Sequence, residues 1–270
     1  MTVRAGRAGL KPAMQGHAHE PGAPPPPARR SRRAVLPASL FGDLPVVVLP
    51  AVDSDGPQHE QIYNRLRQAL IAGRLRPGVS LSLRSLALSL DSGLMPVREA
   101  VRRLAAEGLL HVLENRRLCV PVLTRARFDE LMQARLLLEP ACAVRALPFI
   151  DPARLCRIRD ADARMNASYP AGDAERYMLE NYRFHFEIYH AAPSEVLVPV
   201  LEGVWAQFGP FMRAVFPQVD GAGFRDKHFA AMAAIEAGDG PALAQAVRDD
   251  IDDGRALLER AVSAGDGFAP

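Results

Sequence analysis

The sequence predicts a mainly α-helical protein: an N-terminal winged helix-turn-helix of three helices and a β-hairpin, followed by an all-α bundle of about six helices. Helical patterns from residue 61 onward run into a hairpin pattern that ends at 122. From 124 onward the periodicity is helical, without alternating strands. Residues 61–123 carry ten basic and four acidic side chains, a net charge of +6, whereas 124–270 carry 16 and 22, a net charge of −6. The positive part is therefore the expected contact for nucleic acid, because phosphates require cations.

The third helical pattern, from Pro96 to Gly108, has an apolar side and a charged side. Residues at i, i+3, i+4 and i+7 predict one buried stripe: Val97, Ala100, Val101 and Leu104. The opposite arc carries Arg98, Glu99, Arg102 and Arg103. We expect Pro96 at the first helical position and Gly108 at the end, where a positive φ is often needed. Such a helix suits the major groove of DNA.

Two shorter helical patterns precede it. Apolar residues from Ile62 to Leu70 form a stripe that ends at Gly73, and a turn at 76–78 leads to the second pattern at 85–90. The order of the three patterns is that of a helix-turn-helix with one helix before it.

A β-hairpin is expected after the third helix. The apolar segments 109–113 and 118–122 flank a polar tip at 114–117, and Arg116 and Arg117 place two cations there. This hairpin would be the wing.

Length and composition predict two folded domains and a tail, since 270 residues exceed a usual single domain and 49% apolar residues can fill more than one core. We expect a disordered Pro/Arg-rich tail at 1–57, the winged helix-turn-helix DNA-binding domain at 58–123 and an all-helical domain at 124–264. The arginine cluster at 29–33 fits either a flexible arm that follows DNA or a solvated tail.

Prolines and glycines divide the second domain into helices. The expected segments are 125–147, 152–168, 173–191, 194–216, 222–237 and 240–263. A bundle of this length is large enough to hold a ligand between its helices.

Cysteine usage and hydropathy indicate a cytoplasmic protein. Cys119, Cys142 and Cys156 are odd in number and lack a CxxC spacing, so we expect reduced thiols. No apolar run approaches the roughly 20 residues of a membrane-spanning helix, and the N-terminus lacks the apolar core of a secretory signal. No membrane partner is expected.

The chain resembles the GntR-type transcriptional regulators with a FadR-like C-terminal domain, over roughly residues 58–263. In the first domain three motifs carry the resemblance: 71–78, Pro96-Val97-Arg98-Glu99-Ala100 and Glu107-Gly108-Leu109. In the second domain it is carried by Arg135 with Leu138-Glu139, by Phe184-His185, and by His228 followed by Ala237-Gly238-Asp239. The resemblance implies a homodimer that binds a short palindrome in double-stranded DNA. It also implies that the helical domain mediates dimerisation and binds a small organic acid that alters DNA affinity.

The resemblance assigns DNA contacts to Arg84 and Arg98, and Arg98 could bind a guanine bidentately. Each could instead contact a phosphate or carry a surface charge. Together with the charged arc and the wing, the expected DNA-binding set is Arg84, Met95, Arg98, Arg102, Arg116 and Arg117.

Two departures from the family pattern affect DNA recognition. Gly93, Leu94 and Met95 stand where the family usually has a hydroxyl residue, an arginine and another hydroxyl residue, so one base-reading arginine is missing. Arg116 and Arg117 replace the usual glycine at the tip of the wing, so any minor-groove contact would use arginine side chains.

The resemblance also implies a divalent metal site. The family's aspartate and three histidines fall on Asn181, His185, His228 and Asp250. Imidazole and carboxylate ligands suit zinc, nickel or manganese, although an amide oxygen is a poorer ligand than a carboxylate. The alternative is that His185 and His228 are polar groups in a pocket or core without metal. No organic cofactor is expected.

Arg135 is the expected partner of an effector carboxylate, because a guanidinium can grip a carboxylate bidentately. An ion pair with Glu139 at i+4 is the alternative, and the two roles are compatible. His190 is expected at the surface, and Trp205 and Phe208 in the core or a dimer interface.

Three functions follow as hypotheses. The first is a ligand-responsive DNA-binding regulator, a repressor rather than an enzyme. The second is a metal-dependent enzyme using His185, His228 and Asp250, which lacks an accompanying nucleophile or general base. The third is a DNA-binding regulator whose helical domain no longer responds to an effector.

Overall fold

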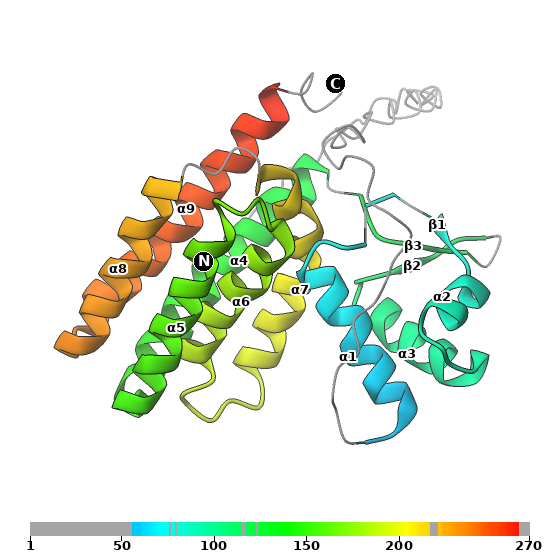
Figure 1. Ribbon diagram of the computed structural model, residues 1–270, viewed down its shortest axis with the longest axis horizontal. Coiled ribbons are helices and arrows are strands. Elements are labelled where there is room, and N and C mark those ends of the chain that lie inside the picture. The colour runs from blue at the N-terminus through cyan, green and yellow to red at the C-terminus, as the bar shows by residue number, and fades with distance from the viewer. Residues whose placement is uncertain are drawn as a thin grey trace, which may run out of the picture. The chain divides into compact units, whose positions relative to one another are not determined.

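The computed structural model describes residues 56–264, except residues 76, 79, 115–116, 123 and 217–220 (Figure 1). The predicted tail at 1–57 therefore lies outside the described residues apart from its last two positions, and Arg116 lies outside them too. Within the described part of the chain, no helix is both long enough and apolar enough to span a bilayer.

The first domain contains three helices and a small sheet. Its helices are α1 (Gln58–Ile71), α2 (Leu83–Ser89) and α3 (Leu94–Ala106), and its strands are β1 (Ser80–Leu81), β2 (His111–Val112) and β3 (Leu118–Cys119). The sheet is antiparallel with the order β1-β3-β2. The predicted winged helix-turn-helix is thereby confirmed, with β1 as a strand that the sequence did not predict.

A side-chain cap explains where the first helix of the helix-turn-helix begins. Ser82 and Ser85 form a capping box, in which the Ser82 hydroxyl accepts a hydrogen bond from the Ser85 amide at 3.0 Å. This cap starts α2 at residue 83, two residues earlier than predicted. Helix α3 starts at Leu94, so Pro96 is its third residue rather than its first. A proline is tolerated there because the N–H groups of the first turn have no partner within the helix.

The predicted apolar stripe of α3 forms the core of this domain. Val97, Ala100, Val101 and Leu104 are all buried and pack with α1 and the sheet. Gly108 follows the helix with a φ of +70°, as expected for a residue that reverses the chain there.

The second domain is a bundle of helices, as predicted. Its elements are α4 (Arg125–Ala146), the short 3-10 helix η2 (Leu147–Phe149), α5 (Pro152–Ser168), α6 (Ala174–Tyr189), α7 (Leu197–Val215), α8 (Gly221–Ala237) and α9 (Gly240–Ala264). Side chains of Thr124, Asp151 and Asp173 cap α4, α5 and α6. Helix α5 packs on α6, and α9 packs on both α4 and α8. Figure 1 shows these helices side by side.

Helix α7 contacts both domains. Trp205 and Phe208 are buried in the core of the bundle, whereas Ala206 is buried in the core of the first domain. Gly209 allows the backbone of α1 to approach closely, because a Cβ there would lie 2.6 Å from the carbonyl oxygens of Leu70 and Ile71. A change in α7 would therefore reach both cores.

Polar contacts join the domains beside this close approach. The Arg127 guanidinium on α4 donates hydrogen bonds to the Gly108 carbonyl at 3.1 Å and to Gln207 at 2.6 Å. Arg67 on α1 pairs with Glu202 on α7 at 3.0 Å.

Candidate functional site

The arginines on the exposed face of α3 differ in whether they form ion pairs within the protein. Arg102 pairs with Glu99 at 3.0 Å. Arg103 pairs with Glu107 at 3.2 Å, and its guanidinium lies 3.8 Å from the centre of the Tyr63 ring. Among the described residues, exposed Arg98 makes no hydrogen bond or ion pair, so its guanidinium is available to an outside partner.

The other residues that are predicted to contact DNA differ in their exposure and in their partners within the protein. Arg84 on α2 is exposed, and Met95 in the first turn of α3 is 63% exposed. Arg117 reaches back to β1, where it donates hydrogen bonds to the Ser80 hydroxyl at 2.7 Å and to the Ser80 carbonyl at 2.8 Å. Its side chain therefore stabilises the sheet through strand β1, a role that the sequence did not predict.

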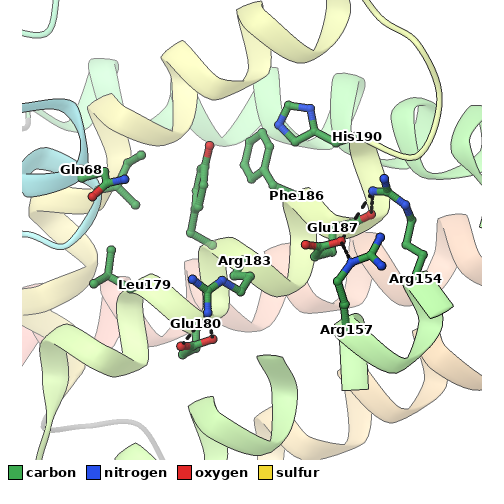
Figure 2. A pocket seen from close by; sticks show the side chains of 11 residues that line it. Gln68, Arg154, Arg157, Leu179, Glu180, Arg183, Phe186, Glu187 and His190 are labelled. Carbon is green, nitrogen blue, oxygen red and sulfur yellow. Dashed lines mark hydrogen bonds and ion pairs between the residues drawn. The ribbon is translucent and has the colours of Figure 1, made fainter. Parts of the chain in front are cut away.

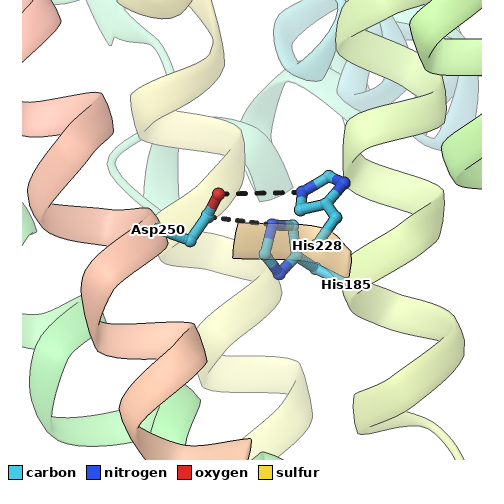
Figure 3. Close-up of side chains that lie close together, drawn as sticks. All are labelled: His185, His228 and Asp250. Atoms are coloured by element: carbon cyan, nitrogen blue, oxygen red, sulfur yellow. Dashed lines mark ion pairs between the residues drawn. The ribbon is translucent and has the colours of Figure 1, made fainter. Parts of the chain in front are cut away.

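The second site lies inside the helical bundle. His185 on α6, His228 on α8 and Asp250 on α9 are buried, and their ligand atoms lie within 4.8 Å of one another. His185 Nε2 lies 3.2 Å from Asp250 Oδ2, and His228 Nε2 lies 3.7 Å from Asp250 Oδ1. Figure 3 shows both imidazoles turned toward the carboxylate. We call these three residues the His–Asp cluster.

The outer nitrogen of each imidazole has its own partner. His185 Nδ1 lies 3.2 Å from the Tyr189 hydroxyl, which donates a hydrogen bond to Glu139 at 2.8 Å. His228 Nδ1 lies 2.7 Å from Asp162 Oδ1 on α5. A partner at Nδ1 favours the tautomer whose bare Nε2 faces inward, which is how metal-binding histidines are commonly oriented.

His185 Nε2 and His228 Nε2 lie at ion-pair distance from Asp250, but the inner polar atoms make no well-formed hydrogen bonds within the described part of the chain. Among the described residues, His185 Nε2, His228 Nε2, Asp250 Oδ1 and Asn181 Oδ1 are all buried without a hydrogen bond. Buried polar atoms are rarely left unpaired in folded proteins. The three from the His–Asp cluster lie together and fit a bound cation, and Asn181 is one turn before His185 on α6.

Electrostatics at the cluster favour an ionised carboxylate. Burial opposes the ionisation of Asp250, but His185, His228 and the charge of Arg135 outweigh it and lower its pKa to about 2. Two imidazoles, one carboxylate and one amide oxygen are a plausible set for zinc, nickel or manganese. The residues present thus fit the expected metal.

Arg135 lies next to this cluster within a second polar network. Its guanidinium is buried, and Nε donates a hydrogen bond to Glu139 Oε1 at 2.5 Å, so the predicted i+4 ion pair is present. Glu139 also accepts a hydrogen bond from Trp205 Nε1 at 3.0 Å. Burial lowers the pKa of Arg135, but Glu139 and Asp250 reverse this and hold the group charged.

Three other predicted positions agree with the structure. Trp205 and Phe208 are core residues, and the Arg135 guanidinium lies 4.5 and 4.8 Å from the centres of their rings. His190 is half exposed and pairs with Glu202 at 2.9 Å, away from the cluster.

Sequence reasoning missed Asp162, Tyr189 and the role of Glu139 in this site. Tyr189 had a weak signal, because it follows His185 by four residues on one helix. Asp162 had none, because its contact with His228 joins helices that are distant in the sequence.

A cleft of about 480 Å³ lies between α1 and the outer side of α5 and α6 (Figure 2). Its arginines are already paired: Arg157 contacts Glu187 at 3.1 Å, and Arg183 contacts Glu180 at 3.2 Å. An anionic ligand would have to displace these carboxylates, so the cleft is a weaker candidate than the His–Asp cluster.

A winged helix-turn-helix joined to a helical domain with a buried His–Asp cluster defines a DNA-binding transcriptional regulator. Residues 58–120 match the family described as bacterial regulatory proteins, gntR family, and residues 130–253 match the FCD domain. The chain belongs to the GntR family of transcriptional regulators and carries an FCD effector-binding domain.

Curated relatives agree with this assignment. The HTH-type transcriptional regulator McbR of Escherichia coli K12 is 28% identical over 166 residues, which cover 62% of this chain and 75% of McbR. The HTH-type transcriptional regulator YdhC of Bacillus subtilis is 32% identical over 88 residues, 33% of this chain and 39% of that protein. The families and relatives that match are regulators rather than enzymes.

Solved structures show the same fold. Escherichia coli McbR/YncC superposes with a TM-score of 0.71 at 25% identity, covering 76% of this chain and 98% of that chain. A GntR transcriptional regulator from Rhodococcus sp. RHA1 superposes with a TM-score of 0.62 at 24% identity, covering 74% and 97%. The predicted family and fold class are confirmed.

Proposed function

We propose that this protein is a cytoplasmic, ligand-responsive repressor that binds a palindromic operator as a homodimer and is controlled by a small organic acid. The observation that carries the ligand-responsive part is the convergence of three buried side chains, His185, His228 and Asp250, whose ligand atoms lie within 4.8 Å of one another inside an FCD domain.

DNA recognition is assigned first to α3. Arg98 is exposed and makes no ion pair with any residue that the structure describes. We propose that it binds a guanine edge in the major groove. Arg102 has Glu99 as a neighbour and fits a phosphate contact better. Met95 supplies an apolar surface beside Arg98 where the family usually has a polar side chain, so base preference near it should differ from that of other members.

Effector binding is assigned to the bundle. A divalent metal would be held by Asn181, His185, His228 and Asp250. Such a metal is a Lewis acid and would bind carboxylate oxygens of the effector. Arg135 supplies a fixed positive charge nearby, and its aromatic neighbours and Glu139 restrict how it can move. An acid bound there would interact with Arg135 while Glu139 retains its hydrogen bonds from Tyr189 and Trp205.

Helix α7 is the proposed link between the two sites. Trp205 contacts Glu139 beside the cluster, and its neighbour Ala206 is buried against the DNA-binding domain. A ligand that shifts Trp205 would thus move a residue of the other core. Coupling of this kind requires the ligand to favour one of two arrangements of α7.

The deciding experiment is the selection of bound duplexes from a random DNA pool at near-physiological salt, with and without zinc. We expect an enriched short palindrome. Salt-sensitive binding without enrichment would contradict sequence-specific regulation and would point to Gly93, Leu94 and Met95 as the cause.

Metal binding needs a separate measurement. Elemental analysis should find a divalent metal in the wild-type protein and none in His185→Ala, with nearly equal helical content by circular dichroism. His190→Ala is the matched control, because His190 is the C-cap residue of the same helix but pairs with Glu202 outside the cluster. Equal metal in wild type and His185→Ala would show that the site is misplaced.

One observation favours a second candidate, a regulator whose FCD domain does not sense an effector. The 3.2 Å contact between His185 and Asp250 could close the cluster as an ion pair if the imidazole is protonated. On this hypothesis the wild-type protein retains no metal, and organic acids leave its melting temperature unchanged.

A further inference from the structure

A large apolar side chain is exposed at the start of the recognition helix α3. Met95 is the second residue of this helix and is 63% exposed, although methionine is a residue type that proteins usually bury. The buried stripe of α3 consists of Val97, Ala100, Val101 and Leu104. Since each residue turns an α-helix by about 100°, Met95 lies opposite that stripe. Its side chain therefore belongs to the side of α3 that faces away from the core.

The groups around Met95 on this side favour DNA as the partner. Arg98 follows Met95 by three residues and is exposed without an ion pair among the described residues. Glu99 follows Met95 by four residues, but its carboxylate pairs with Arg102 at 3.0 Å, which offsets its negative charge. Gly93, the N-cap residue, has no side chain to cap α3, which leaves N–H groups of the first turn available to a phosphate. The first turn of α3 thus combines an apolar side chain with groups that bind DNA.

The chemistry of a thioether limits which base Met95 can contact favourably. Its side chain donates no hydrogen bond and accepts one only weakly. Against the polar edge of guanine, adenine or cytosine, it would displace water from polar groups without replacing their hydrogen bonds. Thymine alone of the four bases presents an apolar group in the major groove, its 5-methyl. We propose that Met95 reads a thymine through contact with this methyl group.

The spacing along α3 also predicts where this thymine lies in the operator. Met95 and Arg98 are about 4.5 Å apart along the helix axis, and successive bases of one DNA strand are about 3.4 Å apart. We therefore expect the thymine within two base pairs of the guanine that Arg98 binds, on either strand. Met95 is then a specificity-determining residue, and this inference rests on the DNA recognition proposed above.

The first part of the test removes the methyl group from the DNA. The probe is the operator selected from the random pool, and the base pair whose preference Arg98→Ala relaxes marks the guanine. Each thymine of one half-site is replaced in turn by uracil, which lacks only the 5-methyl, and affinity is measured by fluorescence anisotropy at constant salt. For the wild-type protein we expect one replacement near the guanine to weaken binding about fourfold, the contribution of one buried methyl group. At that position 5-methylcytosine should bind about fourfold more tightly than cytosine, for the same reason.

The second part removes the thioether from the protein. In Met95→Gln, which keeps the helix propensity but ends in an amide, uracil should change the affinity by less than about 1.5-fold, since no apolar contact with the methyl remains. Leu88→Gln is the control, because Leu88 is 77% exposed on α2, and the first helix of a helix-turn-helix crosses the DNA backbone. This control should keep the fourfold effect. An effect of uracil on DNA flexibility alone would persist in Met95→Gln, so the variant separates contact from DNA shape.

The outcomes separate this inference from the function on which it rests. If an operator is selected but none of its thymines is sensitive to uracil, sequence-specific binding stands and the role of Met95 is wrong. The same conclusion follows if Met95→Gln keeps the fourfold effect. If no operator is selected, the DNA-recognition proposal fails and the inference fails with it.

Discussion

The recognition helix α3 and the cluster helix α6 both carry rows of polar side chains, but α3 exposes them and α6 buries them. Arg98 on α3 is exposed to solvent and has no partner among the residues that the structure describes, which costs the fold little stability. His185 on α6 is buried, and among the described residues its Nε2 has only the 3.2 Å contact with Asp250 and no well-formed hydrogen bond, which lowers the stability of the fold unless something binds there. The difference fits DNA as the partner of α3 and the proposed divalent metal with its effector as the partner of α6.

The largest expected effect tests what burial does to a charge. Arg135→Ala should lower the free energy of unfolding by roughly 3 to 5 kcal/mol, because it leaves the charge of fully buried Glu139 uncompensated. Chemical denaturation measures this. The matched control is Arg125→Ala on the same helix, whose ion pairs with Asp129 and Glu259 are partly exposed and should together contribute less than about 1 kcal/mol. Equal losses in the two variants would contradict the contrast.

The next effect tests the junction between the two regions. Gly209→Ala should lower the free energy of unfolding by about 1 to 3 kcal/mol, because the new Cβ meets backbone oxygens of α1 that cannot move aside easily. Gly203→Ala on the same helix is the control. Among the described residues no atom lies within 4 Å of its Cβ position, so alanine should be neutral or stabilise by about 0.5 to 1 kcal/mol. Similar melting temperatures for the two variants would argue against a tight α1–α7 contact.

DNA recognition by the exposed face gives the third prediction. Arg98→Ala should weaken operator binding by about 1 to 3 kcal/mol and relax the preference at one base pair. Repeating the selection from a random pool with the variant measures both. An unchanged sequence preference would refute base contact by Arg98.

The smallest effect distinguishes the neighbouring cation. Arg102→Ala should weaken binding to all sequences about equally, by less than about 1 kcal/mol, and should reduce the salt dependence by about one counterion. Its ion pair with Glu99 already offsets part of its positive charge, so removal of the side chain should cost little DNA affinity. A change in base preference as large as that of Arg98→Ala would show that the roles of the two arginines are reversed.

Local periodicity made the first domain predictable. The stripe of α3 was identified because all four of its core residues lie within two turns of one helix. Strand β1 was missed because two residues cannot show an alternating pattern, and it is defined only by pairing with β3. Helix α2 starts two residues before the predicted position because Ser82 and Ser85 cap it reciprocally.

The buried site was predictable only in part. Asn181 and His185 are four residues apart, so their common side of α6 follows from the sequence. His228 and Asp250 were named through the resemblance to the GntR family, and the structure brings both to His185. Arg117 shows the opposite outcome: its expected place at the tip of the wing did not reveal that it would bind Ser80.

The sequence alone determined the order of the helices, the charge difference between the domains and the residues that could contact DNA or a metal, because these depend on spacing and composition along the chain. Only the tertiary structure decided that Asp162 orients His228, that α7 has one side in each core and that the Tyr177 hydroxyl has no hydrogen-bond partner within the described ranges. Whether a polar atom is paired depends on groups from other helices, and their approach is set by side-chain packing rather than by local pattern.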